Sequence, residues 1–487
     1  MTNSSHRIFS CLIALTLCVA APGWAESRDK AEAASAGEEY GDAALGRKYH
    51  KQIIATYGQY DVNGLAEYVQ RIGSEVAAHA GGDAYTWHFT ILDDESVNAF
   101  ALPGGYIYIT RALLAHLGSE AQLAAVLGHE IGHVTGRHAA RQHTAARVVG
   151  KVSQSISRPE SGFNLSQLFG AGLVRGYGRE MELEADEQGA RMARDAGYNP
   201  AAMLEVLEIL KARRQYDAAD DDNNEARGNP YHAMLASHPD ADRRLRELAG
   251  EAADSGDLRS DGQAEFLQRI DGLAWSGSKS QGVVRGSDFL HVDLNFAISV
   301  PDGWRIDNLP DRLVAWAAND DAMMQIQLTD RTHRKRRKIP VEKFLQKVTG
   351  MSKWQSARQL EINGLPAFIA TAREMRSPFG LRTGRAAVIF HGDNAYTFHG
   401  VTRDSDRQRR YDRSFDAIIE SMRPLSGAEL EQAQPLAIQV IQLPAGSSLA
   451  DYSNAAAGSQ PLALLRLLNG VYPDGEPEPG ARIKIIR

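Results

Sequence analysis

The spacing of apolar residues predicts a helix-rich unit in the first half of the chain and a strand-rich unit in the second. Between residues 40 and 250, apolar positions recur three or four residues apart, as on one face of a helix. This period predicts amphipathic helices over residues 61–79, 119–147, 180–196, 200–214 and 240–249. From Leu290 the period shortens to two, which is typical of strands with one buried face. The change in period divides the chain into units of different architecture.

The strand-rich unit spans residues 288–425 and is predicted as an α+β domain with an antiparallel sheet. The β-rich runs are residues 291–301, 313–318, 323–328, 367–373, 385–391 and 394–401, interrupted by helices at 341–350 and 408–422. Residues 251–287, which carry Gly, Ser and Asp around one short helix at 264–274, are predicted as a linker. The basic run 334–338 is interpreted as a solvated loop, with a contact to acidic lipid or an acidic partner as the alternative.

The last part of the chain, residues 435–487, shows a third pattern. A short strand at Ile438–Val440 is followed by small residues, then by a leucine-rich helix that ends at Asn469-Gly470. Pro479-Gly480 precedes a final strand near residues 482–485. We expect a small βααβ module. A chain of 487 residues is long enough for these several units.

The N-terminus has the features of an export signal. Arg7 precedes an apolar run over residues 8–21, and small residues at Gly23 and Ala25 predict cleavage after Ala25. Residues 26–39 are predicted to be disordered. Both cysteines, Cys11 and Cys18, lie in the signal, so the mature chain would hold neither a disulfide nor a thiol ligand. With no later run of membrane-spanning length, these features predict a periplasmic protein, and its net charge of −7 argues against nucleic acid as a partner.

The predicted helix at 119–147 carries an H-E-x-x-H sequence at residues 129–133. Ser119 followed by Gln122 has the spacing of a capping box and predicts the helix start. On a helix, residues four apart share a face, so His129 and His133 can bind one Zn²⁺, and Glu130 is placed beside the metal as a base for water. His138 and His143, further along, are interpreted as solvated or substrate-cleft residues without a ligand role.

A catalytic zinc ion takes three protein ligands, so two histidines require one more donor. The acidic helix that begins at residue 180 supplies candidates, and spacing alone leaves Glu180, Glu182 and Glu184 open. Glu182 and Asp186 are four residues apart on one face. One of them can bind the metal while the other accepts a hydrogen bond from a ligand histidine.

These motifs resemble the gluzincin metallopeptidases related to HtpX and the CAAX prenyl protease, and most of all their soluble periplasmic members. The resemblance rests on H-E-x-x-H, on E-x-x-A-D at residues 182–186, on a His-Pro pair at 238–239 followed by Arg244, and on the stretch 98–109. It implies a mainly α zincin-type domain over residues 40–250 with a small β-sheet. It also implies a zinc metalloendopeptidase with one zinc ion per chain, Glu182 as third ligand, Asp186 behind a histidine and Glu130 as catalytic base.

Two further site residues follow from the same resemblance. His238 is expected either to gate the zinc site or to assist catalysis by stabilising the oxyanion, with a surface or capping role as the alternative. Arg244 is expected to orient the His238 loop or to stabilise the oxyanion, with a plain ion pair equally open. Upstream, residues 87–92 and 106–110 are predicted as a hairpin around Pro103-Gly104-Gly105, whose edge could pair with an extended peptide; the alternative is a hairpin that only covers the core.

The C-terminal units carry weaker resemblances. Residues 301–304 and 411–415 resemble a PsbP/Mog1-like domain, and residues 435–487 resemble a divergent LysM module. A LysM module implies contact with peptidoglycan, and a structural cap is the alternative. The implied substrates are misfolded or unassembled envelope proteins, which makes the protein a quality-control protease. The alternative is a chaperone-like outer-membrane assembly factor whose protease site is normally closed.

Overall fold

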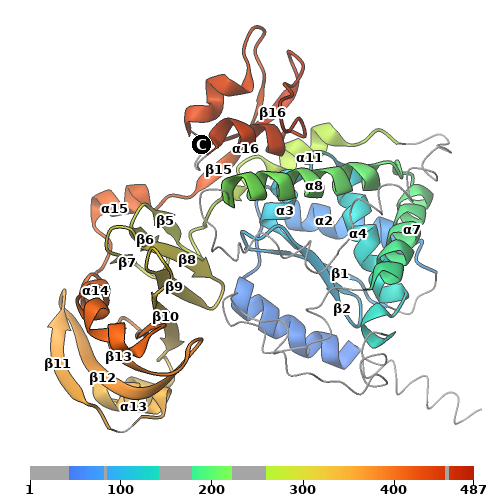
Figure 1. Cartoon of the computed structure of the whole chain (residues 1–487). Helices are drawn as coiled ribbons and strands as arrows, with labels where there is room; N and C mark the ends of the chain where they lie inside the picture. Colours follow the sequence, from blue (N-terminus) through green and yellow to red (C-terminus); the bar gives the residue numbers. More distant parts are fainter. Residues whose placement is uncertain (1–42, 82–84, 142–177, 222–258, 352, 456–459) are drawn as a thin grey trace, which may run out of the picture.

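The computed structural model describes residues 43–81, 85–141, 178–221, 259–351, 353–455 and 460–487. These residues form three packed units: a helix-rich unit, an α+β unit built on one large sheet, and a small C-terminal unit (Figure 1). The predicted signal, the segment 26–39 that is predicted to be disordered, and the predicted helix 240–249 lie outside the described residues. Within the described residues, no helix is both long and apolar enough to cross a bilayer.

The helix-rich unit is built around a three-stranded sheet in the order β1 (His88–Leu92), β3 (Tyr106–Thr110), β2 (Ala99–Leu102). Because strand side chains alternate between faces, β3 packs Ile107 and Ile109 into the main core, among residues of α2 (Leu65–Ala77) and α4 (Glu120–Thr135). Tyr106 and Tyr108 point to the other face, where the helix 43–57 covers them. The sheet is therefore buried on both faces.

The hairpin predicted from residues 87–92 and 106–110 was wrong in its first strand. The turn at Pro103-Gly104-Gly105 joins β3 to β2, whereas β1 pairs with β3 in parallel. Gly104 and Gly105 have φ of 88° and 86°, and a Cβ on Gly105 would lie 2.6 Å from the carbonyl oxygen of Thr86. The turn therefore needs glycine both for its conformation and for its close approach to the chain before β1.

Further helices of this unit among the described residues are α3 (Arg111–His116), α7 (Arg179–Asp195), α8 (Ala202–Asp221) and α11 (Gln263–Ile270). The last of these lies in the predicted linker, yet its residues Phe266, Leu267 and Ile270 are buried in the main core. The predicted helix 119–147 ends at Thr135. Gly136 caps it, Arg137 adopts a left-handed φ of 51°, and a separate helical segment begins at His138.

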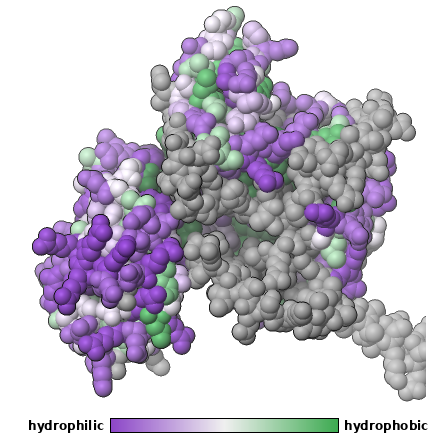
Figure 2. Space-filling model, in the orientation of Figure 1, coloured by the Kyte–Doolittle hydropathy of each residue, from purple (hydrophilic) through white to green (hydrophobic). Residues whose placement is uncertain are grey.

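The α+β unit contains the predicted antiparallel sheet, with seven strands in the order β11-β12-β13-β14-β10-β9-β8. The strands are β8 (Arg305–Leu309), β9 (Arg312–Trp316), β10 (Ala322–Asp330), β11 (Ser356–Ile362), β12 (Leu365–Ser377), β13 (Gly380–His391) and β14 (Asn394–Thr402). One face packs against α13 (Val341–Thr349), and the other packs against α14 (Gln408–Glu420). On the face shown in Figure 2 this unit is mostly hydrophilic.

Shorter elements surround this sheet. The predicted strand 291–301 is split, because β6 (Asp288–His291) and β7 (Phe296–Ser299) form a hairpin that reverses at Asn295, with β5 (Val283–Arg285) beside β6. The basic run includes one helical turn, α12 (Arg334–Arg337), where a loop had been predicted. The remaining elements are η2 (Ser405–Arg407) and α15 (Gly427–Gln432).

The C-terminal unit follows the predicted order, with β15 (Leu436–Gln442), η3 (Leu449–Ala455), α16 (Pro461–Leu468) and β16 (Arg482–Ile486). Its first helical segment is a 3₁₀-helix. β15 pairs with β16 and also with β4 (Ala274–Trp275). The leucines of α16 share the main core with the helix-rich unit. The buried Lys484 ammonium group donates hydrogen bonds to the carbonyl oxygens of Ala115 and Leu117 at the end of α3, at 2.9 and 2.7 Å.

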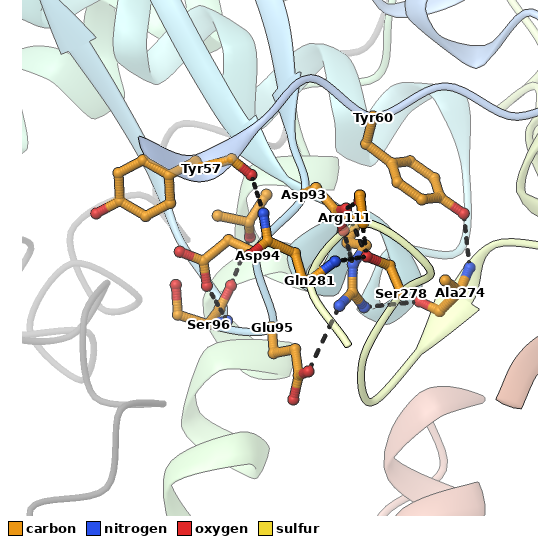
Figure 3. Close-up of polar contacts among 12 residues, drawn as sticks. Tyr57, Tyr60, Asp93, Asp94, Glu95, Ser96, Arg111, Ala274, Ser278 and Gln281 are labelled. Carbon is orange, nitrogen blue, oxygen red and sulfur yellow. Dashed lines mark hydrogen bonds and ion pairs between the residues drawn. The ribbon is translucent and has the colours of Figure 1, made fainter. Parts of the chain in front are cut away.

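A buried polar cluster joins the helix-rich unit to the chain that leads into the α+β unit (Figure 3). Asp93, directly after β1, accepts a hydrogen bond from the Arg111 guanidinium at 2.7 Å and two more from the hydroxyls of Ser278 and Ser280. Arg111 also donates to the carbonyl oxygen of Ala274. Burial raises the pKa values of the adjacent carboxyls, Asp94 and Glu95. The cluster fixes the segment after α11 against the sheet.

Candidate metal centre

The helix that carries the H-E-x-x-H sequence begins where the sequence predicts. The Ser119 hydroxyl accepts a hydrogen bond from the backbone N–H of Gln122 at 3.2 Å, and the Gln122 side chain accepts one from the backbone N–H of Gly118. This pair satisfies N–H groups that a helix start leaves without partners. From Leu123 to Val134 every residue of α4 is buried, so the helix lies inside the unit and its polar residues face other buried groups.

Small residues bring α4 and α7 close together. A Cβ on Gly132 would lie 2.9 Å from the Ala185 carbonyl oxygen, and a Cβ on Gly128 would lie 2.8 Å from the Gly189 carbonyl oxygen. Both distances are shorter than a normal contact, so only glycine permits this separation of the two helix backbones. The short separation brings carboxylates of α7 to the imidazoles of α4.

Three buried donor groups meet between these helices. The Nε2 atoms of His129 and His133 are 3.0 Å apart, and each lies 3.6 Å from a carboxylate oxygen of Glu182. All three residues are at most 3% exposed. Their ligand atoms lie within 4.8 Å of one another, and among the described residues this is the one His, Cys, Asp or Glu cluster that meets this distance criterion for holding a metal ion.

The geometry separates the three acidic candidates on α7. Glu180 is exposed, and the side chain of Glu184 is 35% exposed and turns to other partners. Glu182 is fully buried and faces both imidazoles. Asp186, one turn further along, is also fully buried, and its carboxylate lies 2.8 Å from Nδ1 of His129. Asp186 can therefore accept a hydrogen bond from the ring nitrogen of His129 that faces away from the cluster.

Glu130 lies next to His129 on the same buried helix and is 0% exposed. A buried carboxylate beside a metal centre can accept a proton from a water molecule there. His238 and Arg244 lie outside the described residues, so their roles stay predictions.

His138 is a feature of this centre that the sequence analysis missed. It was interpreted as solvated or as a cleft residue on the same helix as His133, but it is 0% exposed and lies beyond the break in that helix. Its Nδ1 lies 2.8 Å from Nδ1 of His133, and its Nε2 lies 3.3 Å from the Glu184 carboxylate. Burial lowers the pKa of His138, and the hydrogen bond from Arg141 lowers the pKa of Glu184. Gly136, which can end a helix, was the available signal for the break.

The donor set fits a metal ion. Two imidazole nitrogens and one carboxylate oxygen are the protein ligands of one class of catalytic zinc site, which keeps a further position for water or substrate. The burial of the three donors is also consistent with this use, because clustered polar groups are costly to bury without a partner that binds them together.

Comparison with known proteins agrees with this geometry. Residues 64–252 match the family model of peptidase family M48. The chain is 27% identical over 266 residues to the beta-barrel assembly-enhancing protease of Escherichia coli (strain K12), covering 51% of this chain and 52% of the relative. It is 28% identical over 204 residues to the mitochondrial metalloendopeptidase OMA1 of Schizosaccharomyces pombe, covering 41% of this chain and 57% of the relative. The chain thus matches only about half the length of these relatives.

Among solved structures, cyanobacterial PsbP from Synechocystis sp. PCC 6803 matches with a TM-score of 0.24 and 14% identity. The match covers 30% of this chain and 96% of the PsbP chain. A TM-score this low does not establish a shared fold. The PsbP/Mog1-like character of the α+β unit therefore stays a prediction.

Proposed function

Because residues 64–252 form a peptidase M48 domain, we propose that the protein is a zinc-dependent metalloendopeptidase of the bacterial cell envelope. The observation that carries this proposal is the buried cluster of His129, His133 and Glu182, with Glu130 adjacent on the same helix. His129 and His133 would each supply Nε2 to the ion, and Glu182 would supply a carboxylate oxygen. Asp186 would hold the ring of His129 in place through Nδ1.

A bound zinc ion would polarise the peptide carbonyl and make a water molecule more acidic. Glu130 would accept a proton from the attacking water and deliver it to the nitrogen of the leaving amine. Burial of Glu130 keeps bulk water away from its carboxylate and so favours this transfer.

The test uses the purified full-length chain and an unfolded, fluorescently labelled protein substrate. The parent should bind about one zinc ion per chain and hydrolyse the substrate. Glu130→Gln should retain the metal and lose hydrolysis, because the amide cannot accept the proton. Asp195→Asn, which changes an exposed acidic residue at the end of α7, is the control and should match the parent. Hydrolysis that survives Glu130→Gln would refute the assignment.

The substrate class rests on the relatives. The name beta-barrel assembly-enhancing protease supports misfolded or unassembled envelope proteins as substrates. A second candidate function is a chaperone-like assembly factor, which is favoured by the two additional units packed around the catalytic one. Complementation of a deletion strain that has an envelope defect distinguishes the two candidate functions. Rescue by the Glu130→Gln protein supports the assembly role, and rescue by the parent alone supports proteolysis.

For the peptidoglycan contact that the resemblance to a LysM module implies, we propose one surface of the C-terminal unit, with a purely structural cap as the alternative role. An open groove of about 480 Å³ is lined by Gln442, Leu443, Pro444, Ala445, Pro479 and Gly480. Cosedimentation with purified sacculi tests this contact, and Pro444→Asp would weaken it if the groove is the binding surface. Equal sedimentation of parent and variant would exclude the groove.

A further inference from the structure

The two histidines of the metal cluster are supported by different chemical groups. Nδ1 of His129 lies 2.8 Å from the carboxylate of Asp186. Nδ1 of His133 lies 2.8 Å from Nδ1 of a third imidazole, His138. The rings of His133 and His138 are nearly perpendicular, at 78°, with centroids 4.9 Å apart. The second contact joins two imidazoles edge to face, and both residues are buried.

Hydrogen-bond chemistry fixes the direction of this contact. A neutral imidazole carries one N–H and one acceptor nitrogen. If His133 offers Nε2 to a metal ion, its proton is on Nδ1 and is donated to Nδ1 of His138. The proton of His138 must then be on Nε2, which lies 3.3 Å from a carboxylate oxygen of Glu184. The Glu184 carboxylate faces this N–H, so the contact favours the same tautomers that metal binding by His133 requires.

The carboxylate is itself held in position. Arg141 donates from the same Nη1 to Glu184 at 2.8 Å and to the carbonyl oxygen of Gly136 at 3.3 Å. The side chain of Glu184 is 35% exposed, whereas that of His138 is fully buried. The chain of contacts therefore runs from His133 inside the unit to an ion pair at its surface.

The backbone between the two histidines is shaped to make this contact. The helix stops at Thr135, and the left-handed φ of 51° at Arg137 turns the chain so that His138 returns to His133. A Cβ on Gly136 would lie 2.4 Å from Nε2 of His138, so a glycine is needed for the imidazole to occupy this place. A left-handed non-glycine residue is a costly conformation that the surrounding contacts must stabilise.

We propose that His138 is a positioning residue for the metal centre, which fixes the tautomer and ring orientation of His133, and that Glu184 fixes His138 in turn. This inference rests on the proposed function. Partners that hold the outer nitrogen of a ligand histidine typically change metal affinity 10–100-fold when they are removed. His138 does not need to touch substrate or metal to have this effect.

The test compares the zinc affinities of two variants of His138. If His138 only fills space, one variant should bind zinc more tightly, and if it positions His133, the other should. His138→Asn keeps an acceptor oxygen on Cγ, where histidine carries Nδ1, whereas His138→Leu fills the space without an acceptor. Zinc affinity of the full-length protein is measured by competition with a chromophoric chelator. We expect His138→Leu to bind zinc about 10–100-fold more weakly and His138→Asn to recover most of the loss. Equal affinity of His138→Leu and the parent would overturn the proposal, as would a loss in His138→Asn at least as large as in His138→Leu.

A second pair of variants keeps the buried ring intact. Glu184→Ala removes the carboxylate that faces Nε2 of His138, and Glu187→Ala removes an exposed carboxylate from the same helix as the control. Zinc affinity should fall in Glu184→Ala alone, with the thermal unfolding of both metal-free variants close to that of the parent. If the parent binds no zinc, the proposed function fails. If the parent binds zinc and Glu184→Ala and His138→Leu bind it equally well, only the positioning role fails.

Discussion

Gly189 approaches His129 so closely that a Cβ on the glycine would lie 2.6 Å from the backbone nitrogen of the histidine. This contact is the point at which α7 meets the turn of α4 that carries the H-E-x-x-H sequence. It lies within two turns of both Glu182 and Asp186 on α7, so the separation of the helices here sets the reach of both carboxylates.

Gly189→Ala should therefore damage both stability and metal binding. The added methyl group must push the helix backbones apart, which we expect to cost about 1–3 kcal/mol of unfolding free energy. It should also weaken zinc binding, because Glu182 and Asp186 move away from the imidazoles. Denaturant unfolding and chelator competition measure the two effects. Gly178→Ala, at the start of the same helix with nothing within 4 Å of the added Cβ, is the control. Equal unfolding free energies and equal zinc affinities of the two variants would argue against the close contact between α4 and α7 at Gly189.

Removal of the Asp186 carboxylate should weaken zinc binding without removing a ligand. Asp186→Leu leaves Nδ1 of His129 without its acceptor, and we expect zinc affinity to fall about 10–100-fold. Asp186→Asn retains an oxygen that can accept the same hydrogen bond, so its loss should be smaller. The chelator competition assay ranks the two variants and the Glu187→Ala control. If Asp186→Leu and Glu187→Ala bind zinc equally well, Asp186 does not support the metal centre.

Local signals of the sequence predicted the start of α4 and the positions on it that face α7. Ser119 caps the helix as expected, because capping depends on residues only three positions apart. The end of the same helix was missed. Polar and apolar residues keep a helical spacing beyond Thr135, and the left-handed conformation of Arg137 depends on the contacts of His138 with His133 and Glu184.

Contacts between distant parts of the chain could not be predicted from the sequence either. The parallel pairing of β1 with β3 depends on how the segment between them, which includes β2, folds, and the alternation of apolar residues fits either strand direction. The buried pair of Asp93 and Arg111 is completed by Ser278, which lies 185 residues after Asp93. A single sequence, read without an alignment, contains no local signal for such a contact.

The Asp93 cluster gives a prediction about stability. Arg111→Met keeps a similar length but leaves Asp93 and the neighbouring acidic groups without their buried cation, and we expect a loss of about 3–5 kcal/mol of unfolding free energy. Arg71→Met is the matched control, since Arg71 pairs with Glu75 and Glu120 but is 43% exposed, and it should cost at most about 1 kcal/mol. Urea unfolding of both variants measures the difference. Losses of the same size would show that burial of the cluster adds nothing.

The last prediction concerns the pH dependence of the contact between the C-terminal unit and α3. Burial lowers the pKa of Lys484 to about 7, from 10.5 for an exposed lysine. Between these values the unfolded chain binds a proton that the folded chain releases, so this residue makes the protein more stable as pH rises from about 7 to about 10. His116, which lies close by, does not titrate in that window, because burial lowers its pKa to about 3.

Lys484→Met isolates this contribution, because methionine fills the same space without a titratable group. The melting temperature of the parent minus that of Lys484→Met should increase from about pH 6 to about pH 9. At low pH the buried ammonium carries its full desolvation cost, offset by its hydrogen bonds to Ala115 and Leu117. Other titratable groups are present in both proteins, so their contributions to the melting temperature cancel in the difference. A difference that stays constant over this range would mean that the pKa of Lys484 is not lowered in the folded protein, because its hydrogen bonds to the two carbonyl oxygens offset the cost of burial.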